Sequence, residues 1–134
     1  MFRLCVRPSL KIVASVLGLS LLSGAALAGA SCPLTSKDAG GKVESLAEVQ
    51  VVAWPAKEAR PAGVLQTPAL HPDEEMPVKG GLKQVWNINP AGRNVQADCY
   101  YGGNNKPVSV DVTALKHCTA EISTKGVWNS FNCD

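Results

Sequence analysis

The sequence predicts a mainly β protein: an antiparallel meander, small sandwich or open barrel tied by disulfides. Between Lys83 and Asp134, short runs of alternating apolar and polar residues are separated by turn residues. A period of two with turn signals between runs is typical of antiparallel strands with one buried face. The five prolines between residues 55 and 79 exclude a long helix there. The even number of cysteines after residue 28 favours a small domain held by disulfides.

The first 28 residues have the pattern of a secretory signal peptide. Three basic residues precede an apolar run over 12–22, and a small-residue cleavage site follows at 26–28. The apolar run is too short for a membrane-spanning helix. A lipidation signal has a large aliphatic residue three before its cysteine, where this chain has Gly29, so we expect no lipid anchor. We therefore predict an exported, periplasmic chain with a single β-rich domain over residues 29–134.

Cleavage of the signal peptide would change the net charge. The whole chain has a formal charge of +2, but residues 1–28 carry three of its 13 basic side chains and none of its 11 acidic ones. Residues 29–134 therefore have 10 basic and 11 acidic side chains and a formal charge of −1. No basic stripe of the kind that binds nucleic acid remains, so we expect no nucleic-acid partner.

The first substantial run of the predicted domain, residues 43–54, fits either a helical stripe or a strand. β-Branched residues at 49–52 favour a strand, and Pro55 ends it. Residues 55–79 should then form an extended loop that carries the stretch 71–77. A short edge strand is predicted at 63–66 within it, because proline is tolerated at the edge of a sheet.

The remaining runs should form consecutive antiparallel strands joined by turns at 89–92, 102–105, 113–116 and 124–126. Alternation places Trp86, Ile88, Val95, Ala97, Cys99, Tyr101, Val108, Val110, Val112, Cys118, Ala120 and Ile122 on one inward face. It points Trp54 and Trp128 outward, where each could cover a second sheet or a loop, but we expect core packing of both.

Four cysteines lie in the predicted domain: Cys32, Cys99, Cys118 and Cys133. In an exported chain they should form disulfides, and three pairings are possible. Because Cys99 and Cys118 share the inward face, we predict that they pair, and that Cys32 pairs with Cys133 to join the two ends of the domain. The sequence has no C-x-x-C motif and its histidines, His71 and His117, are isolated, so we expect no metal and no other cofactor.

The candidate catalytic groups do not form a recognisable set. Oxidised cysteines leave no thiolate nucleophile, and no serine lies in a G-x-S-x-G setting that could use His71. Glycosidases place two carboxylates on opposite sides of the scissile bond, whereas Asp73, Glu74 and Glu75 follow one another in a single run. We therefore expect a protein that is not an enzyme.

Two stretches are candidate partner-binding surfaces. Asp73, Glu74 and Glu75 form either a solvated acidic loop or a contact surface for a basic partner. Tyr100 should face solvent if Tyr101 faces the core, and it adjoins a turn that contains Asn104 and Asn105. Tyrosine is common at protein interfaces, although a strand-end tyrosine beside an ordinary turn remains the alternative.

Several short motifs occur in a characteristic order along the chain. They are Cys32-Pro33, the aliphatic run 49–53, Val85-Trp86, Cys99-Tyr100-Tyr101-Gly102 and the later Cys118. Together they resemble a family of small exported proteins of Gram-negative bacteria, from which the proline-rich loop departs. Some members resemble periplasmic immunity proteins, found with type VI secretion genes, that block effectors attacking the cell wall.

The resemblance implies a periplasmic inhibitor whose protein partner is a peptidoglycan-active enzyme or effector. Two alternatives stay open. One is a lysozyme-inhibitor-like protein directed at host enzymes. The other is a structural or carrier module that binds a small apolar ligand within the sheet.

Overall fold

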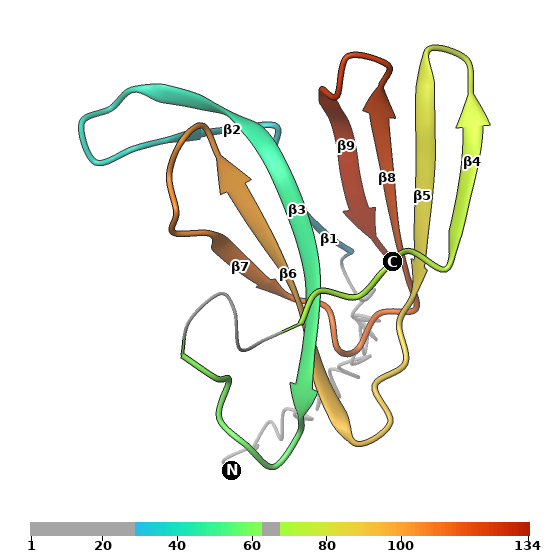
Figure 1. Ribbon diagram of the computed structural model, residues 1–134. Coiled ribbons are helices and arrows are strands. Elements are labelled where there is room, and N and C mark those ends of the chain that lie inside the picture. The colour runs from blue at the N-terminus through green and yellow to red at the C-terminus, as the bar shows by residue number, and fades with distance from the viewer. Residues whose placement is uncertain (1–28, 63–67) are drawn as a thin grey trace, which may run out of the picture.

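The computed structural model describes residues 29–62 and 68–134, and all the regular structure in these two ranges is β-strand (Figure 1). The strands are β1 (Ala30–Ser31), β2 (Thr35–Lys37), β3 (Val43–Pro55), β4 (Glu74–Val78), β5 (Gly81–Asn87), β6 (Arg93–Tyr101), β7 (Val108–Asp111), β8 (His117–Ser123) and β9 (Trp128–Cys133). No helix in these residues is long and apolar enough to cross a membrane. The predicted mainly β, disulfide-tied fold is confirmed, whereas the predicted signal peptide at 1–28 and edge strand at 63–66 lie outside the described residues.

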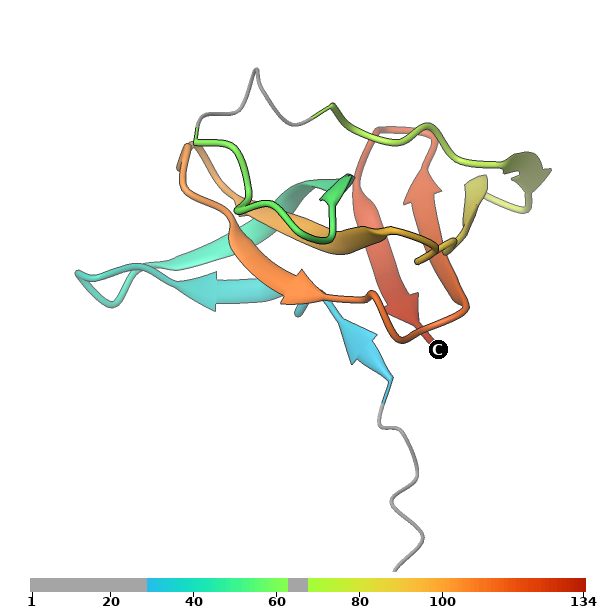
Figure 2. The same ribbon diagram turned by 90° about the horizontal axis from the view of Figure 1, so that it is seen from below.

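Two antiparallel sheets make up the fold, and Figures 1 and 2 show them curling around a common interior as a half barrel. The five-stranded sheet has the order β1-β9-β8-β5-β4 and the four-stranded sheet has the order β2-β3-β6-β7. Four hairpins, β2–β3, β4–β5, β6–β7 and β8–β9, pair as consecutive strands, but the chain changes sheet after β1, β3, β5 and β7. The region after Lys83 is therefore split between two layers, because apolar strand faces are buried only against another layer.

The long strand β3 confirms the strand interpretation of residues 43–54 and is buried on both faces near its end. It pairs with β6 along most of its length, with a bulge between Leu46 and Glu48. Val51 faces the core between the sheets, while Val52 and Trp54 on the opposite face are buried as well. The chain after β3 returns beside this strand, where the Leu70 N–H donates to the Val51 carbonyl at 2.7 Å and Val52 forms a bridge with Ala69. Arg60 of the same connection lies over the Trp54 ring. Trp54 thus points outward, as alternation predicts, but lies under a loop.

Trp128 does not follow simple alternation. The pairing of β8 with β9 shifts between Glu121 and Ile122, which places Trp128 opposite Ile122. A bulge inserts one extra residue and turns the following side chains to the other face. Trp128 consequently packs against the core, so the outward parity was wrong and the expected core packing is confirmed.

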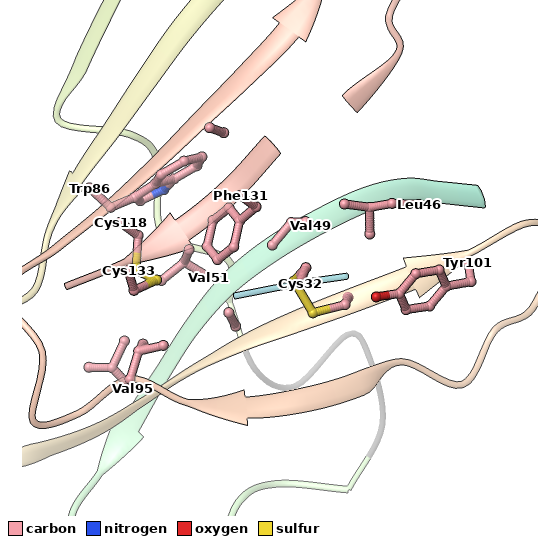
Figure 3. Close-up of a cluster of buried hydrophobic side chains, with 14 residues drawn as sticks. Cys32, Leu46, Val49, Val51, Trp86, Val95, Tyr101, Cys118, Phe131 and Cys133 are labelled. Atoms are coloured by element: carbon pink, nitrogen blue, oxygen red, sulfur yellow. A yellow bond between two sulfur atoms is a disulfide. The ribbon is translucent and has the colours of Figure 1, made fainter. Parts of the chain in front are cut away.

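The disulfides join Cys32 to Cys99 and Cys118 to Cys133, so the predicted pairing was wrong. All four cysteines lie in one buried cluster, in which Figure 3 labels Cys32, Cys118 and Cys133. Cys99 belongs to β6 and Cys118 to β8, however, in different sheets. Cys118 lies directly opposite Cys133 in the β8–β9 pair, with the two Cα atoms 4.0 Å apart. Facing the same interior therefore did not make Cys99 and Cys118 neighbours.

Cys32 lies directly after β1, and β1 belongs to the five-stranded sheet beside β9. The disulfide from Cys32 to Cys99 therefore connects this end of the five-stranded sheet to β6 of the four-stranded sheet. The two ends of the domain do meet, since Ala30 of β1 pairs with Cys133 of β9. Strand pairing rather than a disulfide makes that connection.

Two further sequence predictions need correction. Residues 74–78 were expected to lie in a loop, but they form the edge strand β4, which includes Pro77. An edge position accommodates proline because one side of the strand has no hydrogen-bonding neighbour. Val108 shares the inward face with its partner Cys99, yet it is 50% exposed because the five-stranded sheet does not cover that end of β7.

Candidate functional site

The end of β6 and the turn that follows it carry three of the predicted partner-binding residues: Tyr100 on the strand, and Asn104 and Asn105 in the turn. We call Tyr100 together with residues 102–105 the β6–β7 ridge. Hydrogen bonds hold this turn in place: the Gly102 N–H donates to the Ser45 carbonyl at 3.0 Å, and the Asn104 N–H donates to the Tyr101 carbonyl at 3.1 Å. Gly102 has a φ of 54°, a left-handed conformation that favours glycine.

On the outer face of the four-stranded sheet, a groove of about 480 Å³ runs along the ridge. Its lining residues are Ala47, Glu48, Gln50, Tyr100, Gly102, Gly103, Asn104 and Asn105. Tyr100 is half-buried there and lies opposite Glu48 in the β3–β6 pair. Partial burial raises the pKa of the Tyr100 phenol, and the negative charge of Asp98 raises it further. Tyr100 therefore presents a neutral hydroxyl and a ring that is held on the sheet.

A second groove, of about 610 Å³, lies on the other side of the same turn, between the β2–β3 hairpin and the β6–β7 hairpin. Its lining residues are Ser36, Lys37, Asp38, Ala39, Lys42, Glu44, Tyr101, Gly103, Asn104, Lys106 and Val108. Gly103 and Asn104 line both grooves. The β6–β7 ridge is therefore a convex element with a concave surface on each side.

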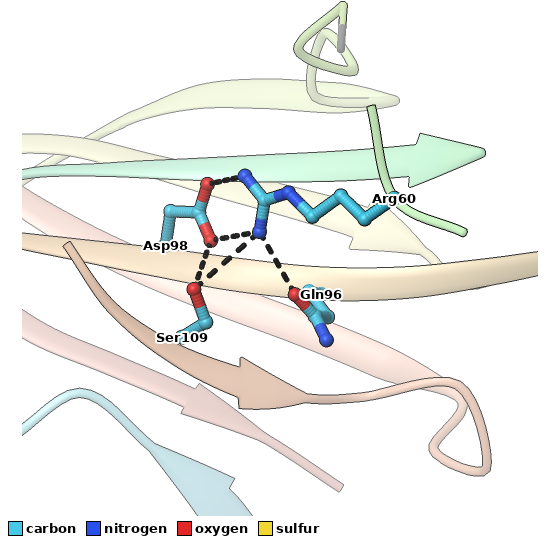
Figure 4. A network of polar contacts seen from close by, with 4 residues as sticks. All are labelled: Arg60, Gln96, Asp98 and Ser109. Atoms are coloured by element: carbon cyan, nitrogen blue, oxygen red, sulfur yellow. Dashed lines mark hydrogen bonds and ion pairs between the residues drawn. The ribbon is translucent and has the colours of Figure 1, made fainter. Parts of the chain in front are cut away.

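A buried ion pair, which the sequence analysis missed, fixes the strand that carries the ridge (Figure 4). The Asp98 side chain on β6 is 1% exposed, and both its oxygens accept hydrogen bonds from the Arg60 guanidinium. Ser109 on β7 donates to Asp98 at 2.8 Å, while Arg60 Nη1 donates to Gln96 Oε1 at 2.8 Å. The hydrogen bonds to Asp98 raise the pKa of Arg60 above its already high value.

This polar network connects three neighbouring strands on the outer face of the four-stranded sheet. Arg60 lies in the loop after β3, and its guanidinium carbon is 5.6 Å from the centre of the Trp54 ring. Arg60 thus contacts β3 through Trp54, β6 through Asp98 and β7 through Ser109. The sequence signal for a covered face was the apolar pair Val52 and Trp54 on the outward side. Nothing in the sequence connected Arg60 with Asp98, 38 residues away.

The other predicted binding residues, Asp73, Glu74 and Glu75, lie at and just before the edge strand β4. They do not form one patch, because successive side chains on a strand alternate between its faces. Asp73 Oδ2 accepts a hydrogen bond from the Asn87 N–H at 2.6 Å, and Glu75 Oε1 accepts one from Gln84 Nε2 at 2.8 Å. Figures 1 and 2 place β4 and the β6–β7 ridge on opposite sides of the molecule.

The chemistry available on these surfaces is that of contact and hydrogen bonding. All four cysteines of the described chain are oxidised. In residues 29–62 and 68–134, no group of three histidine, cysteine, aspartate or glutamate side chains is placed to hold a metal ion. The exposed His117 has Asp134 3.8 Å away, in a shallow hollow beside Leu115.

The chain matches no family model, no curated protein and no solved structure. Its two disulfides indicate an oxidising environment of the kind met by exported proteins.

Proposed function

We propose that this protein is a non-catalytic binding protein of the periplasm that contacts a protein partner through the β6–β7 ridge. The main support for this proposal is the structure of the ridge, a hydrogen-bonded turn beside a half-buried tyrosine with a groove on each side. A convex element of this kind suits insertion into a concave site on a partner.

The composition of the β6–β7 ridge supports recognition of protein. Tyrosine, glycine and asparagine are the residues that antibody loops use most, because tyrosine supplies rigid contact area and asparagine supplies adaptable hydrogen bonding. The Tyr100 ring lies on a strand, and the turn has internal hydrogen bonds through Gly102 and Asn104. Little conformational entropy would be lost when such a surface binds, and preorganisation of this kind raises affinity.

We propose further that the partner is a peptidoglycan-active enzyme or effector, which this protein inhibits as an immunity protein. The support for this partner is the family resemblance of the Cys32-Pro33 and Cys99-Tyr100-Tyr101-Gly102 motifs. An inhibitor that works outside the cytoplasm must also keep its shape there, and the disulfide that joins the two sheets serves that need.

The test uses oxidised residues 29–134 as bait against periplasmic extract and a panel of purified peptidoglycan-active enzymes. The panel includes c-type, g-type and i-type lysozymes. We expect one wall-directed enzyme to be recovered in stoichiometric amount and its activity to be blocked. Selective capture of a host lysozyme would instead favour the host-directed inhibitor, and recovery of no enzyme would contradict the proposal.

A matched pair of variants locates the surface. The triple variant Tyr100→Ala/Asn104→Ala/Asn105→Ala alters the β6–β7 ridge, while Asn129→Ala/Asn132→Ala removes exposed amides from β9. We expect only the first to lose the partner. Equal binding by both variants would contradict the assignment of the ridge as the interface.

A further inference from the structure

We propose that the groove between the β2–β3 and β6–β7 hairpins binds an acidic, partly apolar segment of the protein partner. We call it the inter-hairpin groove. This inference rests on the proposed function and adds the chemistry of the partner to it.

The charged side chains around the inter-hairpin groove differ in whether they have an ion-pair partner within the protein. Lys37, Lys42 and Lys106 line it, together with Asp38 and Glu44. Lys42 pairs with Glu44 at 3.3 Å. No ion pair within the described ranges includes Lys37 or Lys106, so both ammonium groups are available to a ligand.

Asp38 and Glu44 are both engaged within the protein. Asp38 Oδ1 accepts hydrogen bonds from the N–H groups of Gly40 and Lys42, both at 2.9 Å, which closes the turn between β2 and β3. The Glu44 carboxylate lies against the backbone of Gly102, where an added Cβ would be 2.2 Å from its Oε2 atom. The lining therefore has three ammonium groups against two carboxylates, a net charge of +1, with Lys37 on the β2–β3 hairpin and Lys106 on the β6–β7 hairpin.

The lining of the groove also includes apolar side chains, and this distinguishes a peptide segment from a small anion. Val108 is 50% exposed there, and Tyr101 also lines the groove, while its hydroxyl donates to the Pro33 carbonyl at 2.7 Å. A volume of about 610 Å³ is also far more than a phosphate or acetate ion would fill. A segment with carboxylates at its sides and an apolar residue at its centre fits both features.

The position of the groove connects it to the β6–β7 ridge. Gly103 and Asn104 line this groove as well as the outer one, so a partner that encloses the ridge reaches Lys106 as well. The strand β4, which carries Glu74 and Glu75, lies on the opposite side of the molecule from the β2–β3 and β6–β7 hairpins (Figure 2). Because complementary charge speeds encounter and suppresses wrong partners, the lysines would select an acidic contact surface.

The test that needs no partner is a titration of ¹⁵N-labelled residues 29–134 with the peptide acetyl-Glu-Glu-Leu-Leu-Glu-Glu-amide at low ionic strength. We expect shifts of the amide signals of residues 36–44 and 101–108. In Lys37→Glu/Lys106→Glu the apparent affinity should fall about tenfold, because two exposed charge pairs are lost and the new carboxylates repel those of the peptide. The control Lys79→Glu/Lys125→Glu makes the same charge change on exposed turns of the other sheet and should bind like the original protein.

Three outcomes would overturn the inference. One is equal weakening by the two charge-reversal variants, which would show a general effect of net charge. Another is the absence of shifts in the groove. The third is an equal response to inorganic phosphate, which would assign the lysines to small anions. The two proposals can also fail separately. A partner whose binding depends on Tyr100 but not on Lys37 and Lys106 would contradict the groove inference and support the proposed function. If no enzyme is recovered, the proposed function fails, but a positive peptide titration still supports an acidic ligand of the groove.

Discussion

The edge strand β4 and the β6–β7 ridge were both candidate binding surfaces, yet they are built very differently. β4 is attached through pairing with β5 alone, and none of its five residues is buried. The ridge ends β6, which pairs with strands on both sides, carries the disulfide-bonded Cys99 and holds the buried Asp98. Exposure and charge alone would favour β4 as the interface, whereas rigidity and concave surroundings favour the ridge.

The acidic and proline residues of β4 have a structural explanation. An exposed edge strand can pair with another chain, and proteins limit this with charged side chains and proline. Glu74, Glu75 and Pro77 therefore protect the edge whether or not they contact a partner. The β6–β7 ridge has no comparable structural role that would explain its tyrosine.

Loss of the disulfide between the sheets is expected to have the largest effect. The chain-entropy model gives about 4 kcal/mol for the Cys32–Cys99 bond and about 3 kcal/mol for Cys118–Cys133, which span 67 and 15 residues. We expect Cys32→Ser/Cys99→Ser to lower the free energy of unfolding more than Cys118→Ser/Cys133→Ser in urea titrations. Hydrogen exchange should accelerate at the ridge only in the first variant; acceleration at β4 alone would contradict the view that β6 supports the ridge.

Arg60→Ala should be the next most damaging change. It leaves the 1% exposed Asp98 without its cation, which we expect to cost about 3 kcal/mol in the free energy of unfolding. Adding Asp98→Asn should recover part of the loss because it removes the unpaired buried charge. Thermal or urea unfolding measures both variants, and a double variant less stable than Arg60→Ala would rule out the proposed cause.

Tyr100→Ala should weaken the partner complex by about 2 kcal/mol, or about thirtyfold in Kd, as expected of a central tyrosine. Tyr100→Phe separates the ring from the hydroxyl, and we expect it to keep most of the affinity. Surface plasmon resonance with the recovered enzyme gives both values. A Kd unchanged in Tyr100→Ala would remove the ridge from the interface.

Charge reversal on β4 should have the smallest effect. We expect Glu74→Lys/Glu75→Lys to change Kd by less than about threefold, mainly through the association rate, because these charges are exposed. Asp73 is left intact in this variant since it holds the Asn87 N–H. A sharp loss of affinity would place β4 in the interface and would indicate a basic partner surface there.

Local patterns alone predicted much of this fold. Alternation identified β3, β5, β6, β8 and β9, and it placed residues such as Val95, Ala97 and Ala120 in the core, because a strand with one buried face must repeat every two residues. Turn residues marked the corners, including Gly92, Gly102 and Gly126 with their positive φ angles. The same parity put Tyr100 on the outer face beside the turn.

The tertiary structure decided what the local pattern leaves open: which strands are neighbours and what covers each face. Cys99 and Cys118 have the same parity but lie in different sheets, so the disulfide pairing depended on topology. A bulge, invisible in the sequence, turned Trp128 onto the core. Arg60 and Asp98 meet only because a loop crosses the sheet, and the inter-hairpin groove exists only because two hairpins lie side by side. Alternation specifies the face of each residue, whereas contacts between distant strands depend on how the whole chain packs.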